Sequence, residues 1–297
     1  MSFDLFHGEC VVIIGESGSG KTATVSSILR LLPASTARVA ADSIRLEGTD
    51  IQDVSDSEMQ TIRARKIGMI FQDPTAALDP SMRIGDQLWE VLRVHEGMDR
   101  KAAKERAVSL LRSVDIPEPE SRYRSYAHEL SGGMRQRAMI ALAIALDPAM
   151  LIADEPTTAL DTTVQAQILD LLDEKRDAGM ALLFVTHDLG VAARIADRLL
   201  VMYAGGVVEE GPGVEVLQHP GHPYTAGLLA CTPDPLRRST GLRPIPGSPP
   251  VLDQLPVGCP FADRCPHAED ICETEAPPRV ELSIGHWSRC HFPERVR

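Results

Sequence analysis

The feature that most constrains this chain is a glycine-rich octapeptide near its start, Gly15-Glu16-Ser17-Gly18-Ser19-Gly20-Lys21-Thr22. The preceding stretch from Cys10 to Ile14 is apolar and β-branched, which predicts a buried strand. The residues that follow, Ala23 to Leu32, have helical spacing and precede Pro33, so they predict a helix. A glycine loop between a strand and a helix is the setting in which the pattern G-x-x-x-x-G-K-T binds phosphate. The alternative, a glycine-rich turn with an accidental Lys-Thr pair, is disfavoured by this setting.

The residue types of the loop suit a nucleotide. Glycines let the backbone turn with its N–H groups pointing at one anion, and the unpaired amides at the helix start add to the same positive field. Lys21 can reach the β- and γ-phosphates, and the Thr22 hydroxyl can ligate Mg²⁺. We therefore predict that Gly15–Thr22 binds the phosphates of a nucleotide.

The overall composition narrows the class of protein. A chain of 297 residues suits one large domain or two, and a hydrophobic share of 43% supports a sizeable core. We expect neither a membrane-spanning helix, which needs ~20 apolar residues, nor a signal peptide. A formal net charge of −12 argues against binding to a phosphate backbone, so no nucleic-acid partner is expected. Six cysteines without an export signal favour reduced thiols, a metal site or catalysis over disulfides.

Predicted strands and helices alternate along the chain, which indicates an α/β fold with a mostly parallel sheet. A capping box, Ser55 with Glu58, predicts a helix that runs to about residue 65. A hairpin is expected around Gly205-Gly206. The other buried strands are predicted at residues 66–71, 150–153 and 181–185.

Changes in hydrophobic periodicity and in proline content divide the chain into parts. Residues 74–148 show almost only helical patterns, so we interpret them as a helical insertion between two strands. Prolines crowd residues 233–260 and regular periodicity ends after residue 232, which predicts a small irregular extension. We predict a nucleotide-binding lobe made of residues 1–73 and 149–231, and a helical subdomain made of residues 74–148. The extension comprises residues 232–297.

Asp154 and Glu155 directly follow a predicted buried strand. In a phosphate-loop ATPase, Asp154 would hold the Mg²⁺ shell, and Glu155 would orient or deprotonate the attacking water. An Asp-Glu pair at a strand end is a weak signal on its own, because solvated strand ends often carry such residues. The phosphate loop upstream is what favours the catalytic interpretation.

The order of these motifs resembles that of the ATP-binding-cassette ATPases over about residues 8–230. In chain order, the resembling motifs are the Walker A loop Gly15–Thr22, the Q-loop residue Gln72, the signature Leu130–Met134, the Walker B strand Leu151–Glu155, the D-loop Ala159–Asp161 and the switch histidine His187. Met134 departs from the glutamine that many cassettes carry there. The stretches at residues 131–137, 154–161 and 222–225 are similar to the ATPase subunits of oligopeptide and dipeptide importers, a group that includes nickel importers.

The resemblance implies a RecA-like P-loop NTPase core that hydrolyses ATP to ADP and phosphate. Beyond the loop and Asp154-Glu155, the site residues that it implies are Gln72, Ser131, Gly132, Gly133, Asp161 and His187. The signature residues would close over the ATP held by a second cassette, because two cassettes pair head to tail in this family. His187 would contact the γ-phosphate, Gln72 would sense Mg²⁺ and link to the membrane subunits, and Asp161 would connect the two sites.

The implied function is that of an ATPase subunit of a peptide importer, peripheral on the cytoplasmic face of the cell membrane. The implied partners are a second, homologous ATPase, two transmembrane permeases and an extracytoplasmic solute-binding protein. The alternatives are a soluble cassette ATPase of repair or translation, a catalytically silent regulatory cassette, and an importer of nickel or another small solute. A soluble ATPase usually shows two fused cassettes or a coiled-coil insertion. The intact Lys21, Asp154, Glu155 and His187 disfavour a silent cassette.

Members of this family carry a stretch ahead of the phosphate-loop strand, with an aromatic side chain that stacks on adenine. The sequence begins at Met1, too close to the loop to include that stretch, and Phe3 and Phe6 are interpreted as strand-packing residues. We therefore expect a truncated or misassigned start, and weak ATP affinity for the isolated chain.

The tail carries four cysteines in the pattern Cys259-x5-Cys265-x6-Cys272-x17-Cys290. Four thiolates can hold Zn²⁺ or an iron–sulfur cluster. Zinc ribbons usually offer Cys-x-x-Cys pairs, whereas these wider spacings suit a larger cluster. The tail also resembles the C-terminal extension of peptide-importer ATPases, some of which carry a 4Fe–4S cluster. We favour that cluster in a structural role, with zinc and plain reduced thiols as alternatives.

Overall fold

The computed structural model describes residues 1–158, 160–231 and 244–296, and the chain divides into two compact units. The first unit comprises Met1–Asp4, Cys10–Thr22 and Val185–Arg297. The second comprises Leu5–Glu9 and Ala23–Phe184. The division into a two-piece lobe, a helical subdomain and an extension stays a prediction, and its boundary at residue 232 lies outside the described residues.

The strands of the first unit place the phosphate loop at the end of a buried strand. Their order is β1 (Cys10–Ile14), β7 (Arg198–Tyr203), β8 (Gly206–Pro212), β10 (His286–Arg289) and β9 (Arg279–Ser283). β1 pairs in parallel with β7, and the other neighbours are antiparallel. Every residue of β1 is buried, which confirms the predicted strand. The predicted hairpin is confirmed as well, because Ala204 and Gly205 both adopt the left-handed conformation that a tight turn requires.

The helices of the first unit are short. They are α9 (Leu189–Ile195), α10 (Gly213–Gln218), α11 (Pro223–Ala230), α12 (Asp270–Thr274) and the 3₁₀ turns η2 (Ala262–Arg264) and η3 (Pro293–Arg295). α11 begins with Pro223 at its first position, after His222, whose Nδ1 accepts a hydrogen bond from the Tyr224 amide (3.0 Å). Burial lowers the pKa of His222 to about 3, so this ring stays neutral and keeps its acceptor.

The tail is more regular than its sequence indicated, because β9 and β10 form a hairpin that joins the sheet on β8. The contact between β10 and β8 includes buried polar side chains. His286 Nε2 lies 2.8 Å from Glu209 Oε1, and both side chains are at most 1% exposed. The Trp287 indole donates to Glu210 at 3.2 Å. β9 was not predicted; it is a short edge strand in which only Val280 and Leu282 are apolar.

The strands of the second unit lie in the order β4 (Ile67–Ile70), β5 (Met150–Asp154) and β6 (Ala181–Thr186), whose last two residues belong to the first unit. β4 and β5 are parallel, as expected for an α/β fold. A separate hairpin joins β2 (Arg45–Leu46) to β3 (Thr49–Asp50). The remaining helices are α2 (Asp56–Arg65), α3 (Pro74–Ala77), α4 (Ile84–Glu96), α5 (Arg100–Ser113), α6 (Pro119–Arg122), η1 (Ala127–Glu129), α7 (Gly132–Ala143) and α8 (Thr162–Asp177).

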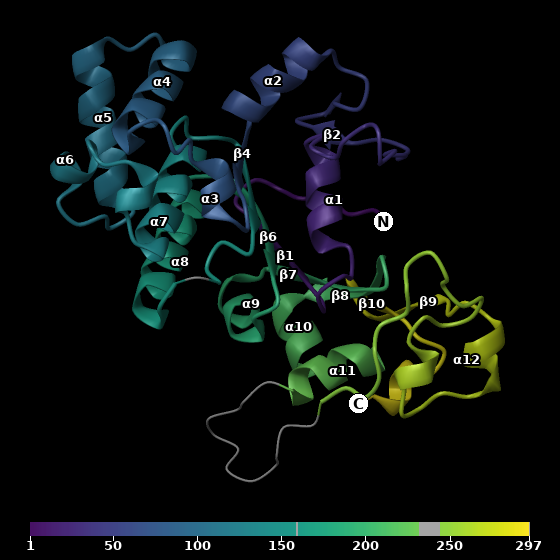
Figure 1. Cartoon of the computed structure of the whole chain (residues 1–297). Coiled ribbons are helices and arrows are strands. Elements are labelled where there is room, and N and C mark those ends of the chain that lie inside the picture. The colour runs from purple at the N-terminus through teal and green to yellow at the C-terminus, as the bar shows by residue number, and fades with distance from the viewer. Residues whose placement is uncertain (159, 232–243, 297) are drawn as a thin grey trace. The chain divides into compact units, whose positions relative to one another are not determined.

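The stretch between β4 and β5 is helical, as predicted, and α4 and α5 lie side by side in it (Figure 1). α4 buries Leu88 and Leu92 on one face and ends where Gly97 adopts a left-handed conformation. α5 begins at Asp99, whose carboxylate accepts from the amides of Lys101 and Ala102 (2.8 and 2.9 Å).

The starts of three helices bear on the candidate site, and the first differs from its predicted bounds. α1 (Lys21–Ile28) starts at the phosphate-loop lysine and ends early, because Arg30 turns left-handed. α7 starts at Gly132, directly after its cap Ser131. α3 has Pro74 at its first position, where the missing N–H of proline costs no hydrogen bond. None of the described helices is long and apolar enough to cross a bilayer.

Candidate nucleotide-binding site

The phosphate loop is closed by its own lysine. The Lys21 ammonium donates to the carbonyls of Gly15 (2.7 Å) and Glu16 (3.0 Å), and the side chain is only 6% exposed. Gly18 and Gly20 adopt φ angles of +79° and +99°, which side-chain-bearing residues rarely accept. The backbone thus makes the turn that the sequence predicted, with the lysine held across it.

The loop is also seated on the β7–β8 turn. A Cβ atom on Gly15 would lie 2.2 Å from the carbonyl oxygen of Met202, so only glycine fits there. The Ser19 carbonyl accepts from the Gly205 amide at 3.0 Å. Thr22 lies in the first turn of α1 with its side chain exposed, which suits its predicted role as a Mg²⁺ ligand.

In the second unit, the structure brings Gln72 and Glu155 together although they are far apart in sequence. Gln72 Nε2 donates to Glu155 Oε2 at 3.2 Å, and Thr158 Oγ1 donates to the same oxygen at 3.2 Å. Asp154 ends β5 and is 2% exposed. Glu155 adopts φ +49°, a left-handed conformation that is uncommon outside glycine and turns the chain sharply after the strand. The roles assigned to these residues stay predictions.

The signature residues stand at the start of α7. Ser131 caps this helix of 12 residues, and its Oγ accepts from the Met134 amide at 3.2 Å. Gly132 and Ser131 are exposed, and nothing lies within 4 Å of a Cβ atom on Gly132, so a ligand can approach the helix start. Gly133 is half-buried. Gln136, which ends the Ser-Gly-Gly-x-x-Gln pattern, is buried and donates to the Pro156 carbonyl at 2.6 Å, just after Glu155.

Asp161 and His187 each stand at the boundary of an element. Asp161 caps α8, and its carboxylate accepts from the amides of Thr163 and Val164 (3.1 and 3.0 Å). Ala159 of the predicted D-loop lies outside the described residues. His187 is exposed between β6 and α9 in the first unit, and its contact with the γ-phosphate stays a prediction.

The four tail cysteines line one small pocket of the first unit. Cys259, Cys265, Cys272 and Cys290 share it with Phe261. Burial raises the pKa of the Cys259 and Cys265 thiols, and that of Cys290 to about 11. Among the described residues, however, no group of three or more His, Cys, Asp or Glu side chains is arranged to hold a metal ion. The structure therefore shows four cysteines that line one pocket but no metal-ligand group, and the cluster stays a prediction.

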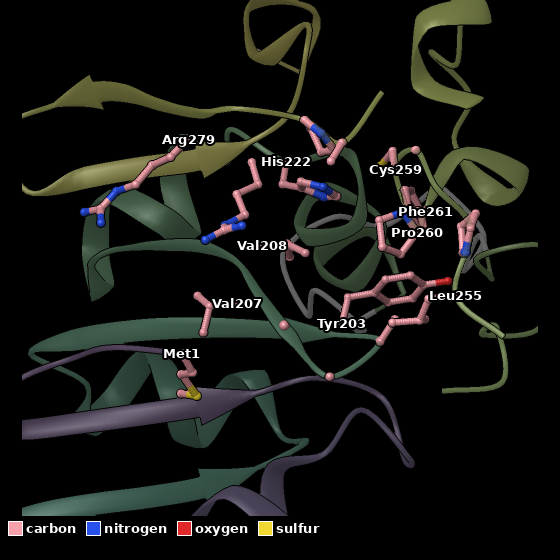
Figure 2. Close-up of a pocket in the computed structure, with 18 of the residues that line it drawn as sticks. Met1, Tyr203, Val207, Val208, His222, Leu255, Cys259, Pro260, Phe261 and Arg279 are labelled. Carbon is pink, nitrogen blue, oxygen red and sulfur yellow. The ribbon is translucent and has the colours of Figure 1, made fainter. Parts of the chain in front are cut away.

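A larger pocket of about 580 Å³ lies beside it in the same unit. Figure 2 shows Tyr203 from the end of β7 beside Phe261 and Cys259 of the tail. The rings of Tyr203 and Phe261 meet edge-on, with centroids 5.2 Å apart. This aromatic contact packs the cysteine-bearing tail against the hairpin that supports the phosphate loop.

Sequence reasoning missed two residues that reach the phosphate loop. The amide of Glu16 donates to the Tyr224 hydroxyl at 2.7 Å, and the Glu16 carboxylate accepts from Arg264. Tyr224 is fully buried, and burial raises the pKa of its hydroxyl. The only available signal was the His-Pro-Tyr-Thr stretch at residues 222–225, which carries the resemblance to peptide importers but has no obvious chemistry.

Comparison with known proteins agrees with this geometry. Residues 1–158 match the ABC transporter family. The chain belongs to that family. Residues 208–272 of this ABC protein also match the oligopeptide/dipeptide transporter C-terminal region. ATP with Mg²⁺ is the expected ligand of such a cassette.

Curated relatives cover nearly the whole chain. The dipeptide transport ATP-binding protein DppD of Bacillus subtilis is 47% identical over 99% of this chain and 88% of its own length. The oligopeptide transport ATP-binding protein OppD of Salmonella typhimurium is 48% identical over 99% of this chain and 87% of its own length. Among solved structures, a bacterial ABC transporter cassette in dimeric form matches with a TM-score of 0.64 and 30% identity, over 71% of this chain and 88% of that one.

Proposed function

We propose that this chain is the ATP-binding and ATP-hydrolysing subunit of an importer of dipeptides or oligopeptides, bound peripherally to the cytoplasmic face of the cell membrane. One observation carries the proposal: a complete phosphate loop is joined in one chain to the C-terminal region of oligopeptide and dipeptide transporters. The likeness to DppD and OppD along nearly the whole chain supports the same solute class over nickel and over a soluble ATPase.

The described residues suit hydrolysis of ATP to ADP and phosphate. Lys21 and the loop amides bind the phosphates, while Thr22 and Asp154 are the candidate holders of Mg²⁺, which neutralises phosphate charge when bound. Glu155 takes a proton from the attacking water as its oxygen bonds to the γ-phosphorus and the bond to ADP breaks. Gln72, hydrogen-bonded to Glu155, orients that carboxylate and links nucleotide binding to the membrane subunits.

The exposed start of α7 supports an ATP site completed by a second cassette. Ser131 and the Gly132 amide lie open to a partner's ligand at the positive end of the helix dipole. A dimeric cassette is among the similar solved structures. We propose a homologous second ATPase as the partner, together with two transmembrane permeases and an extracytoplasmic solute-binding protein.

Purification of the native complex tests this function. We expect an affinity-tagged chain, extracted in detergent, to bring down two hydrophobic permeases and a second cassette ATPase. ATP hydrolysis by this complex in proteoliposomes should rise when the solute-binding protein is supplied with dipeptides or oligopeptides. Stimulation by nickel but not by peptides would contradict the peptide assignment. A chain that purifies without hydrophobic partners and responds to nucleic acid or ribosomes would contradict the importer assignment altogether.

We propose further that Cys259, Cys265, Cys272 and Cys290 hold a 4Fe–4S cluster with a structural role. Their convergence on one pocket supports a shared ligand, and thiolates are the donors that such clusters require. The thiols must lose their protons to bind, so burial alone opposes ligation and the bound iron must offset it. A short, proline-rich segment gains most from such a staple.

Metal analysis tests the cluster. Protein purified without oxygen should be brown, absorb near ~400 nm and contain iron and sulfide in equal amounts. Cys272→Ser should lose the colour, whereas Cys231→Ser, which alters the cysteine at the end of α11, should keep it. A colourless protein with one zinc per chain would establish the zinc alternative. If the protein contains no metal and all four tail thiols react with a thiol reagent, the cysteines are plain reduced thiols and both metal assignments are wrong.

A further inference from the structure

The phosphate loop is tied to the cysteine segment, residues 258–292, through the side chain of Glu16. Arg264 Nη1 donates to Glu16 Oε2 at 2.7 Å, and Nη2 donates to Oε1 at 2.9 Å. This is the two-pronged pairing that fixes a carboxylate in orientation as well as in position. The Glu16 side chain therefore points back to the tail and is held there by 2 parallel hydrogen bonds.

All three nitrogens of the Arg264 guanidinium are engaged. Nε donates to the Pro246 carbonyl at 2.8 Å, and Nη1 also donates to the Tyr203 hydroxyl at 3.3 Å. The Arg264 side chain is only 4% exposed. Its guanidinium carbon, Cζ, lies 5.7 Å from the ring centroid of Tyr203 and 5.8 Å from that of Phe261. A guanidinium that is buried and hydrogen-bonded through all three nitrogens is fixed in orientation. Arg264 therefore fixes the position of the carboxylate with which it pairs, in addition to neutralising its charge.

The backbone that carries Arg264 is fixed by the cysteine segment. Arg264 ends η2 and directly precedes Cys265. The Ala262 amide donates to the Cys259 carbonyl at 3.0 Å, and the Cys259 amide donates to the Cys272 carbonyl at 2.7 Å. Any change that disorders the backbone around the four cysteines is therefore expected to shift the backbone of Arg264 and its guanidinium.

Both the backbone and the side chain of Glu16 are hydrogen-bonded. Its amide donates to Tyr224 Oη, its carbonyl accepts from Lys21 Nζ at 3.0 Å, and its carboxylate meets Arg264. Lys21 is the phosphate-binding lysine, so the position of Glu16 bears directly on the position of that ammonium. Two of these three contacts come from residues beyond β8.

We propose that Arg264 is a positioning residue for nucleotide binding, through which the cysteine segment holds the phosphate loop in its ATP-ready shape. This inference rests on the proposed ATPase function and adds a link between the tail and the loop. Its guanidinium is bonded to the Glu16 carboxylate, so Arg264 acts on the loop through Glu16. ATP affinity thereby becomes dependent on the integrity of the four-cysteine pocket.

Binding of MgATP to the purified full chain tests the link, with affinity measured by equilibrium dialysis and folding by thermal unfolding. Arg264→Gln should raise the Kd about tenfold, a coupling of ordinary size. Glu16→Gln keeps the shape and removes the charge, and it should do the same. The double variant should be no weaker than either single one, because both remove one contact. If Arg264→Gln fails to fold, Glu16→Gln carries the same test.

The matched control is Arg295→Gln, which breaks an exposed ion pair between Arg295 of η3 and Glu269 of the cysteine segment. It should leave the Kd unchanged. Cys290→Ser should weaken ATP binding in the natural chain but add nothing in the Arg264→Gln background. Equal loss of affinity in Arg295→Gln, or undiminished affinity in both Arg264→Gln and Glu16→Gln, would overturn the inference. A natural chain that binds no MgATP would instead overturn the proposed function beneath it.

Discussion

Replacing Glu155 with glutamine should reduce ATP hydrolysis by about 10²–10⁴-fold, the range typical of losing a general base. The amide keeps the size of the side chain and can still contact Gln72 and Thr158, but it cannot accept the proton of the attacking water. Nucleotide binding should persist, so the variant should accumulate bound ATP. Phosphate release by the purified transporter complex, together with the identity of the bound nucleotide, measures both effects.

Glu174→Gln is the matched control for that experiment, because Glu174 is an exposed residue of α8 outside the candidate site. It should hydrolyse ATP at the natural rate. A Glu155→Gln complex that turns over normally would remove Glu155 from its assigned role. Loss of ATP binding in that variant would show that Glu155 is needed for nucleotide binding and not only for the reaction.

Replacing Lys21 with alanine should raise the Kd for MgATP by about 100-fold, which corresponds to ~2.7 kcal/mol. Lys21 supplies the one side-chain charge within the phosphate loop that can contact phosphate. Its ammonium also bonds the Gly15 and Glu16 carbonyls, so its removal loosens the turn that shapes the loop. Binding of a fluorescent ATP analogue measures the loss.

The control is Lys66→Ala, which removes an exposed lysine paired with Glu47. Surface pairs of this kind contribute little, so ATP affinity and thermal stability should change only slightly. Unchanged affinity in Lys21→Ala would show that the loop amides bind the phosphates without the lysine. Thermal unfolding separates a loss of binding from a loss of fold.

Local signals predicted the parts of the fold that depend on neighbouring residues. The capping box of Ser55 and Glu58 forms as expected, with the Glu58 amide donating to Ser55 Oγ and the Ser55 amide donating to Glu58. β1 forms where five apolar residues stand together. These elements are short-range, so a single sequence carries most of the information that specifies them.

Long-range pairs were beyond the reach of the same signals. Glu16 and Arg264 are separated by 248 positions, and each alone reads as an ordinary charged residue. β10 has one large apolar residue, Trp287, and its buried polar neighbours find partners only across the sheet. Such pairings are decided by tertiary packing, which composition and periodicity do not encode.

The candidate site was predicted unevenly for the same reason. The glycine loop and the strand end at Asp154 follow from spacing that is local to each motif. Gln72 and His187 gained a role only from their place in the family order, because a lone residue of either type has no distinctive signal. The contact between Gln72 and Glu155 is what the structure adds.

The strand order of the first unit has a consequence for synthesis. β1 is made near the start of the chain, but its partner β7 emerges almost two hundred residues later, and β10 completes the sheet only near the C-terminus. Contacts of such high sequence separation form slowly, while an exposed strand edge invites association with other chains. The nascent phosphate-loop strand therefore lacks its partner β7 until residues 198–203 have been made, and loss of the last two strands leaves β8 with an open edge.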